Sequence, residues 1–313
     1  MPFPRLWTHV RLSWEMATPP PDVLFVPAHV LPIVHPIPAV VTVHDLGYLR
    51  YPSAHTRAAR RYLHWSTGHS ARAASMAIAD SRATRNDLVS AYGIAGDKVE
   101  VAYPGCPEGF APVRDPTTLA RAQARYGTGA RYFLHLGTLQ PRKNLALLID
   151  AFRGLLQRGA IGDEVRLVLA GRRGWLSEEI VAKAQSPQVG GRVGVPGYVA
   201  AEDIPALLSG AFALVFPSLY EGFGLPVLEA MACDTPVICS NTSSLPEVAG
   251  DAALLVDPLD QRDLALAMEH IYRDPSLRQR LALRGRERVK MFSWDSCART
   301  VLTVLESVAG ARR

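Results

Sequence analysis

The sequence contains no glycine in its first 46 residues. A Rossmann-type dinucleotide fold places a glycine-rich loop after its first strand, because only glycine lets the backbone approach a phosphate closely. That loop is missing from the first part of this chain. No apolar run approaches the roughly 18 consecutive residues that a membrane span needs. Internal repeats and low-complexity segments are also missing.

Cysteine is scarce and forms no C-x-x-C motif, which favours reduced, buried thiols over disulfides or metal ligands. The first residues, Met1–Arg5, lack the basic start and apolar core of a signal peptide. We therefore expect a cytoplasmic protein. The histidines show no metal-ligand spacing among themselves, so we expect no metal site. The residues considered are Cys106, Cys233, Cys239, Cys297, His35, His64, His69 and His135.

Length and charge set broad limits. A chain of 313 residues is long enough for two domains of about 150 residues, each with its own core. The 34 Lys and Arg residues exceed the 29 Asp and Glu residues, giving a net charge of +5. This balance favours an acidic partner: a nucleotide diphosphate, a phospholipid surface or nucleic acid. It does not choose among the three.

Apolar strand-like segments alternate with helical segments along most of the chain, which predicts parallel sheets with helices on both faces. We place a domain boundary after residue 112, so the expected domains are 1–112 and 113–292. The expected strands are 22–27, 40–44, 76–79, 99–103, 132–136, 165–170, 192–195, 213–216, 237–239 and 253–256. The expected helices are 54–74, 82–92, 145–156, 177–184, 201–208, 225–233, 261–272, 275–291 and 294–308.

Two carboxylates flank a glycine-containing loop in the segment 213–234. A buried strand, 213–216, leads into the loop, and Pro226 marks the first turn of the next helix. Such a junction presents free backbone N–H groups to an anion. Glu221 lies in the loop and Glu229 about two turns along the helix, so both could face one ligand. Taken alone, this spacing also fits an ordinary surface pair.

Basic residues follow another predicted strand. Gly137 ends the strand 132–136, and Arg142 and Lys143 precede a helix. Arg offers a bidentate fork and Lys a compact charge, and both suit a diphosphate. A surface Arg-Lys pair is the alternative.

The first half offers two weaker signals. His44 ends the strand 40–44, and ligands of open α/β sheets lie beyond such strand ends, although a single histidine is more often structural. The helix 54–74 carries several arginines beside Trp65. Its basic face is either solvated or docked on anionic lipid headgroups.

The string from Glu221 to Glu229, Glu-Gly-Phe-Gly-Leu-Pro-Val-Leu-Glu, resembles the E-x7-E signature of retaining nucleotide-sugar glycosyltransferases of family four. The string Gly-Thr-Leu-Gln-Pro-Arg-Lys-Asn-Leu, from Gly137, resembles the donor-phosphate segment of the same family. The resemblance implies an α/β fold of the GT-B type, with two Rossmann-like domains facing across a cleft. The first domain is expected to be shortened and to be completed by the last helix, 293–313.

The resemblance also implies roles for the two glutamates. Glu229 would accept the ribose hydroxyls, and Glu221 would bind hydroxyls of the donor sugar. The backbone of the next residues would lie beside that sugar; they are Phe223, Gly224 and Leu225.

Further roles follow from the same resemblance. Gly137, Arg142 and Lys143 would hold the diphosphate, and the nucleobase would lie near Tyr198 and Val199. His44 would hydrogen-bond the donor sugar. His44, Lys143 and Glu221 are therefore the expected catalytic residues, with no metal and no cofactor.

The implied reaction is transfer of a hexosyl unit from GDP- or UDP-hexose to a hydroxyl of a glycan or glycolipid, in cell-envelope polysaccharide or glycolipid synthesis. Peripheral contact with the inner membrane face through the helix 54–74 is expected as an accompaniment. Nucleic acid is not expected as a partner, because the basic helix lacks interleaved exposed aromatics.

Three departures from the family pattern affect these expectations. Thr138 stands where many relatives have Arg, and Asp234 where relatives usually have Gly. Against the family pattern, the chain is also expected to start late, without the first strand and glycine loop of its relatives. A donor-binding but inactive protein is therefore the alternative prediction.

Overall fold

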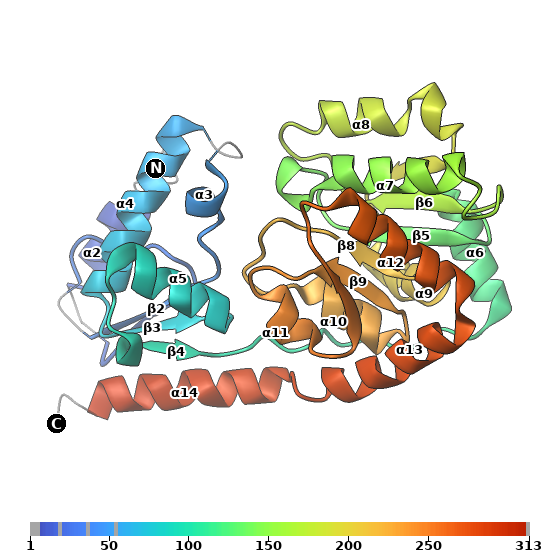
Figure 1. The fold of residues 1–313 in the computed structure, drawn as a ribbon. Coiled ribbons are helices and arrows are strands. Elements are labelled where there is room, and N and C mark those ends of the chain that lie inside the picture. The colour runs from blue at the N-terminus through green and yellow to red at the C-terminus, as the bar shows by residue number, and fades with distance from the viewer. Residues whose placement is uncertain (1–6, 18–20, 36–37, 53–55, 311–313) are drawn as a thin grey trace. The chain divides into compact units, whose positions relative to one another are not determined.

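The computed structural model describes residues 7–17, 21–35, 38–52 and 56–310, which form two compact units (Figure 1). The first unit comprises Met1–Gly105 and Ser293–Arg313, and the second comprises Cys106–Phe292. Residues 106–112, which the sequence placed in the first domain, belong to the second unit. The reason is local contact: the Cys106 thiol lies 3.9 Å from the Leu228 carbonyl oxygen.

A four-stranded parallel sheet forms the centre of the first unit, in the order β1-β2-β3-β4. β2 (Ala39–Val43) is buried at every position, as expected for a strand covered on both faces. Helix α14 (Trp294–Gly310) covers one face, where Val304 packs with Val40 and Ile78. The other elements are β1 (Leu24–Val26), β3 (Met76–Ala79), β4 (Val99–Val101), η1 (Trp7–Arg11), α2 (Leu12–Glu15), α3 (Gly47–Arg50), α4 (Arg57–Ala73), α5 (Arg82–Tyr92) and η3 (Gly96–Lys98).

The second unit is built on a six-stranded parallel sheet in the order β10-β9-β8-β5-β6-β7. From β5 the chain builds β6 and β7 on one side, and it then crosses to the other side for β8, β9 and β10. The direction of winding therefore reverses between β5 and β8, and the carboxyl ends of strands at such a point are where open α/β sheets bind ligands. The strands are β5 (Tyr132–Leu136), β6 (Arg166–Ala170), β7 (Val193–Gly197), β8 (Leu214–Phe216), β9 (Val237–Ser240) and β10 (Ala253–Val256).

Helices cover both faces of this sheet (Figure 1). Phe133 of β5, Leu148 of α7 and Met268 of α12 are fully buried in one apolar core, so the strand ends are held by a rigid scaffold. The helical elements are α6 (Pro116–Tyr126), α7 (Leu145–Gln157), α8 (Glu178–Ala184), α9 (Ile204–Ser209), α10 (Leu225–Ala232), α11 (Leu245–Ala249), α12 (Gln261–Arg273), α13 (Pro275–Val289) and the 3-10 turns η4 (Pro141–Lys143), η5 (Pro187–Val189) and η6 (Ala201–Asp203).

The sequence prediction omitted helix α6. Its start and end follow ordinary capping rules: Asp115 accepts a hydrogen bond from the Thr118 amide at 2.9 Å, Pro116 stands in the first turn, and Gly127 ends the helix at φ 61°. These signals are present in the sequence, just after the predicted domain boundary at residue 112.

Among the described residues, no helix combines the length and the apolar character that crossing a membrane requires.

Candidate functional site

The loops that follow β5, β6 and β7 form one connected edge of the second sheet. The Gly137 amide donates to the Ala170 carbonyl at 2.9 Å, and the Gly171 amide donates to the Gly197 carbonyl at 2.8 Å. A Cβ atom on Gly171 would lie 1.9 Å from the Gly137 carbonyl oxygen, so a side chain cannot be accommodated there. The loops that follow β5 and β6 therefore approach each other backbone to backbone, next to the point between β5 and β8 where winding reverses.

The turn η4 holds the predicted phosphate-binding cations at this edge. It ends at Asn144, whose φ of 58° lies in the left-handed region that asparagine tolerates well. The Asn144 amide group donates to the Pro258 carbonyl at 2.7 Å. The Leu219 amide donates to the Arg142 carbonyl at 2.9 Å. Backbone bonding thus joins η4 to the loop that follows β8.

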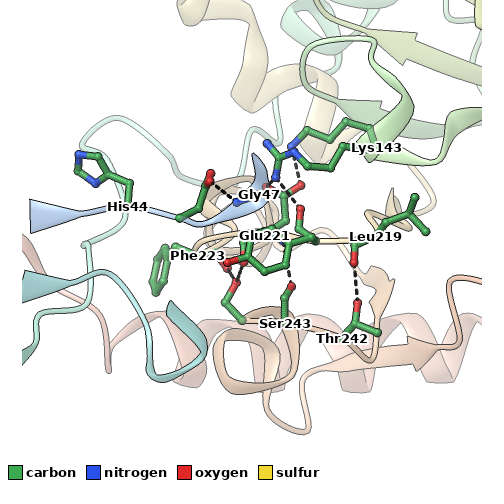
Figure 2. Close-up of polar contacts among 12 residues, drawn as sticks. His44, Gly47, Lys143, Leu219, Glu221, Phe223, Thr242 and Ser243 are labelled. Atoms are coloured by element: carbon green, nitrogen blue, oxygen red, sulfur yellow. Dashed lines mark hydrogen bonds and ion pairs between the residues drawn. The ribbon is translucent and has the colours of Figure 1, made fainter. Parts of the chain in front are cut away.

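Glu221, in that loop, pairs with both cations. The Lys143 ammonium donates to Glu221 Oε1 at 2.6 Å, and the Arg142 guanidinium donates to Oε2 at 3.1 Å (Figure 2). Arg142 also donates to the Tyr220 carbonyl at 2.5 Å. Lys143 is only 8% exposed and Glu221 only 7%. The three side chains form a buried cluster with one surplus positive charge, which we call the ion triad.

The backbone around Glu221 is held independently of the triad. The Glu221 amide donates to Ser243 Oγ at 3.0 Å, and Ser244 Oγ donates to the carbonyls of Glu221 and Phe223 at 3.0 and 2.6 Å. Figure 2 shows Ser243 close to the Glu221 backbone. The carboxylate therefore projects from a loop that has its own supports.

Charge, rather than exposure, determines the ionisation of Glu221. Burial by itself would raise the pKa of this carboxyl group. The charges of Lys143 and Arg142 outweigh burial and hold the pKa of Glu221 below its usual value. The carboxyl group is therefore ionised at neutral pH and neutralises one of the two cations.

His135, the fourth residue of β5, lies next to the triad and is uncharged. It is fully buried, and its Nδ1 lies 3.1 Å from the Val215 carbonyl, which can only accept a hydrogen bond. Nδ1 therefore carries the proton, and Nε2 is a buried acceptor that no described group pairs with. Burial, reinforced by the charge of Lys143, lowers the pKa of His135 to about 4. The ring stacks on Phe216, over which the Lys143 ammonium also lies, at 4.7 Å.

Glu229 lies in α10 and differs from Glu221 in having no cation beside it. No hydrogen bond or ion pair of its carboxyl group is found within the described ranges. Burial raises the pKa of Glu229 to about 7, because the charged form loses hydration without compensation. The group can thus accept hydrogen bonds as a carboxylate just above neutral pH.

The start and end of α10 agree with the sequence prediction. Gly224 precedes the helix at φ 116°, Pro226 lies in its first turn, and no side chain caps it. The first-turn amide of Leu225 is thus left without a side-chain cap. Phe223 is buried at 6% exposure. Asp234 has φ 60° and pairs with Arg286, so an aspartate occupies a left-handed backbone position here.

The predicted nucleobase segment lies after β7, two strands from β5. Val199 is buried, whereas Tyr198 is 61% exposed and carries the Arg172 guanidinium 4.7 Å from its ring centroid. Because the Gly197 carbonyl accepts the Gly171 amide, this segment belongs to the same edge as Gly137. The structure thus places Gly137, Val199 and the ion triad along one edge of the second sheet.

Within the described ranges, no group of three or more His, Cys, Asp or Glu side chains could hold a metal ion.

Comparison with protein families decides the classification. Residues 117–288 match the model described as "Glycosyl transferases group 1", and residues 2–108 match "Glycosyltransferase Family 4". The chain belongs to the group 1 glycosyl transferases. The matched range of the first model contains the ion triad, Glu229 and Val199.

Individual relatives agree with this assignment. The chain is 34% identical over 260 residues to the O-antigen chain mannosyltransferase B of Escherichia coli, covering 83% of this chain and 68% of that protein. The chain spans about half, 53%, of the length of other curated relatives that it matches.

Solved structures show the same GT-B architecture. The sucrose-phosphate synthase of Thermosynechococcus elongatus has a TM-score of 0.74 and 28% identity, covering 88% of this chain and 69% of that one. Anabaena HepE in complex with UDP-glucose has a TM-score of 0.73 and 22% identity, covering 87% and 72%, and this likeness shows the fold alone.

In the first unit of this glycosyl transferase, β2 ends at Val43, and His44, predicted as the last residue of the strand, directly follows it. Its Nδ1 lies 2.8 Å from Asp80 Oδ2, and its Nε2 lies 3.1 Å from the Pro27 carbonyl oxygen. Both partners accept hydrogen bonds, so a ring that makes both contacts is doubly protonated. The hydrogen bond to Asp80 raises the pKa of His44, although burial opposes it. The predicted contact of His44 with a sugar stays a prediction.

Sequence reasoning missed several members of these clusters. Asp80 and Pro27 follow strands β3 and β1, so their position at strand ends was the signal that could have found them. His135 was considered only as a metal ligand. Ser243 and Ser244 lie in the segment that follows β9, but their bonds to the loop at Glu221 require the three-dimensional fold.

Proposed function

We propose that this glycosyl transferase moves a hexosyl unit from a nucleotide-diphosphate sugar to a hydroxyl of a glycan or glycolipid, with retention of anomeric configuration. The observation that carries the proposal is the buried ion triad at the reversal point of the sheet, with Glu229 on the adjoining helix. The cations of the triad can bind a diphosphate, Glu221 can accept hydrogen bonds from a sugar, and Glu229 can accept them from a ribose.

Phosphate recognition falls to Arg142 and Lys143. Each charge-assisted hydrogen bond to a phosphate oxygen is worth roughly 1.5–3 kcal/mol. The bonds also stabilise the charge that develops on the departing diphosphate. Because Arg142 and Lys143 can neutralise the departing diphosphate, we propose that catalysis needs no metal ion.

Ribose recognition falls to Glu229, whose carboxylate can accept from both hydroxyls. Val199 and Tyr198 would flank the nucleobase. The backbone of Phe223, Gly224 and Leu225 would lie against the hexose.

The reaction we favour is same-face attack. The bond between sugar C1 and the phosphate oxygen breaks, a bond between C1 and the acceptor oxygen forms, and the acceptor proton passes to the leaving diphosphate. No covalent carboxylate nucleophile is then needed. We therefore assign Glu221 no role as a nucleophile. His44 would hydrogen-bond the donor sugar from the first unit.

For the donor we propose GDP- or UDP-hexose. One relative is named a mannosyltransferase of the O-antigen chain, and one structural neighbour is described with UDP-glucose. The name of the first relative favours a role in cell-envelope polysaccharide or glycolipid synthesis. We propose a cytoplasmic location for this role, and nucleic acid is not among the proposed partners.

Titration calorimetry with UDP and GDP tests the proposed donor site. Glu229→Ala and Lys143→Ala should each weaken binding tenfold or more, or about 1.4 kcal/mol, in variants that circular dichroism shows to be folded. Unchanged affinity for every nucleotide diphosphate would contradict the proposal.

An inactive, donor-binding protein is the alternative. The relatives named above are described as a transferase and a synthase, which favours activity. Screening nucleotide sugars for slow donor hydrolysis separates the two, because an inactive protein would bind a donor and release no hexose.

We further propose peripheral contact with an anionic membrane through α4. The sequence placed this helix at 54–74; it is α4 in the structure, and residues 54 and 55 lie outside the described ranges. Arg57, Arg61 and Trp65 are exposed, the last at 48%, and no ion pair of either arginine is found in the described part of the chain. An exposed tryptophan next to unpaired cations on one helix suits a headgroup layer.

Vesicle sedimentation tests this contact. Protein should sediment with phosphatidylglycerol vesicles, much less with phosphatidylcholine vesicles, and less at high salt. The triple variant Arg57→Gln, Arg61→Gln and Trp65→Ala should lose the binding. The control variant Arg262→Gln, Arg280→Gln should keep it. Equal binding of the triple variant and the wild type would refute the contact.

A further inference from the structure

The ion triad poses a problem for donor binding. Its two cations are the groups expected to hold the diphosphate, yet Glu221 already occupies both. Lys143 and Glu221 are almost completely buried and 2.6 Å apart, and such charge-assisted bonds are among the strongest in proteins. An arriving diphosphate must therefore compete with Glu221.

No other described anion can take over the neutralising role. In the described part of the chain, the ion pairs of Lys143 and Arg142 are both with Glu221. His135 beside Lys143 is uncharged. The surplus charge of the triad is one, although two cations are present, so removal of the Glu221 charge would double the positive charge offered to a ligand.

The carboxylate can leave the cations without dismantling the loop. Ser243 and Ser244 hold the Glu221 backbone, and the Leu219 amide joins the loop to Arg142 through backbone atoms. The Glu221 side chain can therefore change partners while the backbone of its loop stays in place. A carboxylate released from two cations needs new donors, since a buried and unpaired charge is costly.

We propose that Glu221 is the internal counter-ion of the donor-phosphate cations and is displaced from them by the diphosphate. This inference rests on the proposed function. The displaced carboxylate then takes hydrogen bonds from hydroxyls of the donor hexose. Binding of the diphosphate thereby frees the hydrogen-bond acceptor that holds the hexose. The hexose is therefore held firmly only when it is part of an intact nucleotide sugar.

The proposal makes opposite predictions for two ligand classes in Glu221→Gln. A glutamine cannot neutralise the cations, so the variant should bind inorganic pyrophosphate and UDP or GDP more tightly than the wild type. We expect roughly tenfold, the gain from freeing about one charge-assisted hydrogen bond. A glutamine also replaces a charged acceptor, so UDP-glucose or GDP-mannose should no longer bind more tightly than the nucleotide alone.

Titration calorimetry with pyrophosphate, UDP, GDP and the two nucleotide sugars tests this on wild type, Glu221→Gln and a matched control. The control is Glu164→Gln, which removes an exposed glutamate paired with Arg131 at the opposite end of β5; it should behave as wild type. If Glu221→Gln does not fold, Glu221→Asp retracts the charge by one methylene and should also tighten pyrophosphate binding, to a smaller extent.

The outcomes are distinct. Weaker or unchanged pyrophosphate binding by a folded Glu221 variant overturns the counter-ion role while leaving the donor site in place. A wild-type protein that binds none of the five ligands overturns the proposed function, and this inference with it. Tighter pyrophosphate binding together with loss of the hexose contribution supports the inference.

Discussion

Glu221 and Glu229 are separated by seven residues, and both carboxyl groups are shielded from solvent. Their pKa values are nevertheless shifted in opposite directions from the ordinary value of a glutamate. Burial alone would raise the pKa of both. At Glu221 the charges of Lys143 and Arg142 outweigh burial, whereas at Glu229 burial acts unopposed and raises the pKa to about 7. The comparison teaches that the position of the cations, not the depth of burial, decides which carboxyl group of the site is charged.

Removing Lys143 should have the largest effect on stability, because it takes away the cation that distinguishes Glu221 from Glu229. Lys143→Met leaves Glu221 with Arg142 alone, and it should lower the free energy of unfolding by about 3–5 kcal/mol, the usual cost of breaking a buried ion pair. Lys143→Arg, which keeps the charge, should cost clearly less. Urea denaturation at neutral pH measures both.

A double variant makes that test specific. Lys143→Met combined with Glu221→Gln should lose less free energy of unfolding than the sum of the single losses, because neither charge is then stranded. Strictly additive losses would show that the two side chains do not depend on each other.

Glu229→Gln removes the carboxyl group whose pKa burial raises. The pKa of Glu229 is about 7 in the folded protein and 4.5 in the reference state, so the folded state holds the proton more tightly and stability is lost as pH rises through this interval. The variant should therefore exceed the wild type in free energy of unfolding above pH 7, by on the order of 1–3 kcal/mol, and match it near pH 4.5. An advantage that does not change with pH would contradict this account.

His135→Asn tests the same effect of burial on a basic group, whose pKa burial lowers instead of raising. The pKa of His135 is lowered from 6.5 to about 4, so the unfolded chain binds the proton more readily and stability is lost as pH falls through that interval. Asparagine can keep a donor near the Val215 carbonyl but cannot be protonated. Between neutral pH and about pH 4.5, the variant should lose about 2 kcal/mol less than the wild type, as followed by denaturation at both pH values.

Ser243→Ala should have the smallest effect. It leaves the Glu221 amide without its acceptor, which costs about 1 kcal/mol of unfolding free energy, while the triad stays intact. Pyrophosphate affinity should not change. A large loss of affinity would mean that the serine, and not the cations, positions the carboxylate.

Local elements were largely predictable from the sequence. The ranges of β3, α5, β5 and β10 were predicted as the structure has them, because apolar runs between turn residues give strong signals. Arg142, Lys143 and Glu221 could also be singled out from the sequence, because their spacing to strand ends is local information, and the structure brings them into contact. Their roles toward a donor stay a prediction.

Two kinds of feature were not predictable. Strand order places β8 beside β5, and it brings η4 against the loop of Glu221, although Lys143 and Glu221 are 78 positions apart in the sequence. No local pattern encodes that contact. The state of His135 depends on the Val215 carbonyl of β8, which also becomes a neighbour only through sheet pairing.

Helix α14 has a consequence for synthesis of the chain. The second unit is one uninterrupted stretch, so it can fold as soon as its last residues leave the ribosome. The first sheet is translated earlier, but the helix whose Val304 and Val308 pack against Val40 and Ile78 is made after the whole second unit. The apolar side of β2 and β3 therefore stays without this helix while residues 106–292 are made, so the unit whose sheet is made first is completed last.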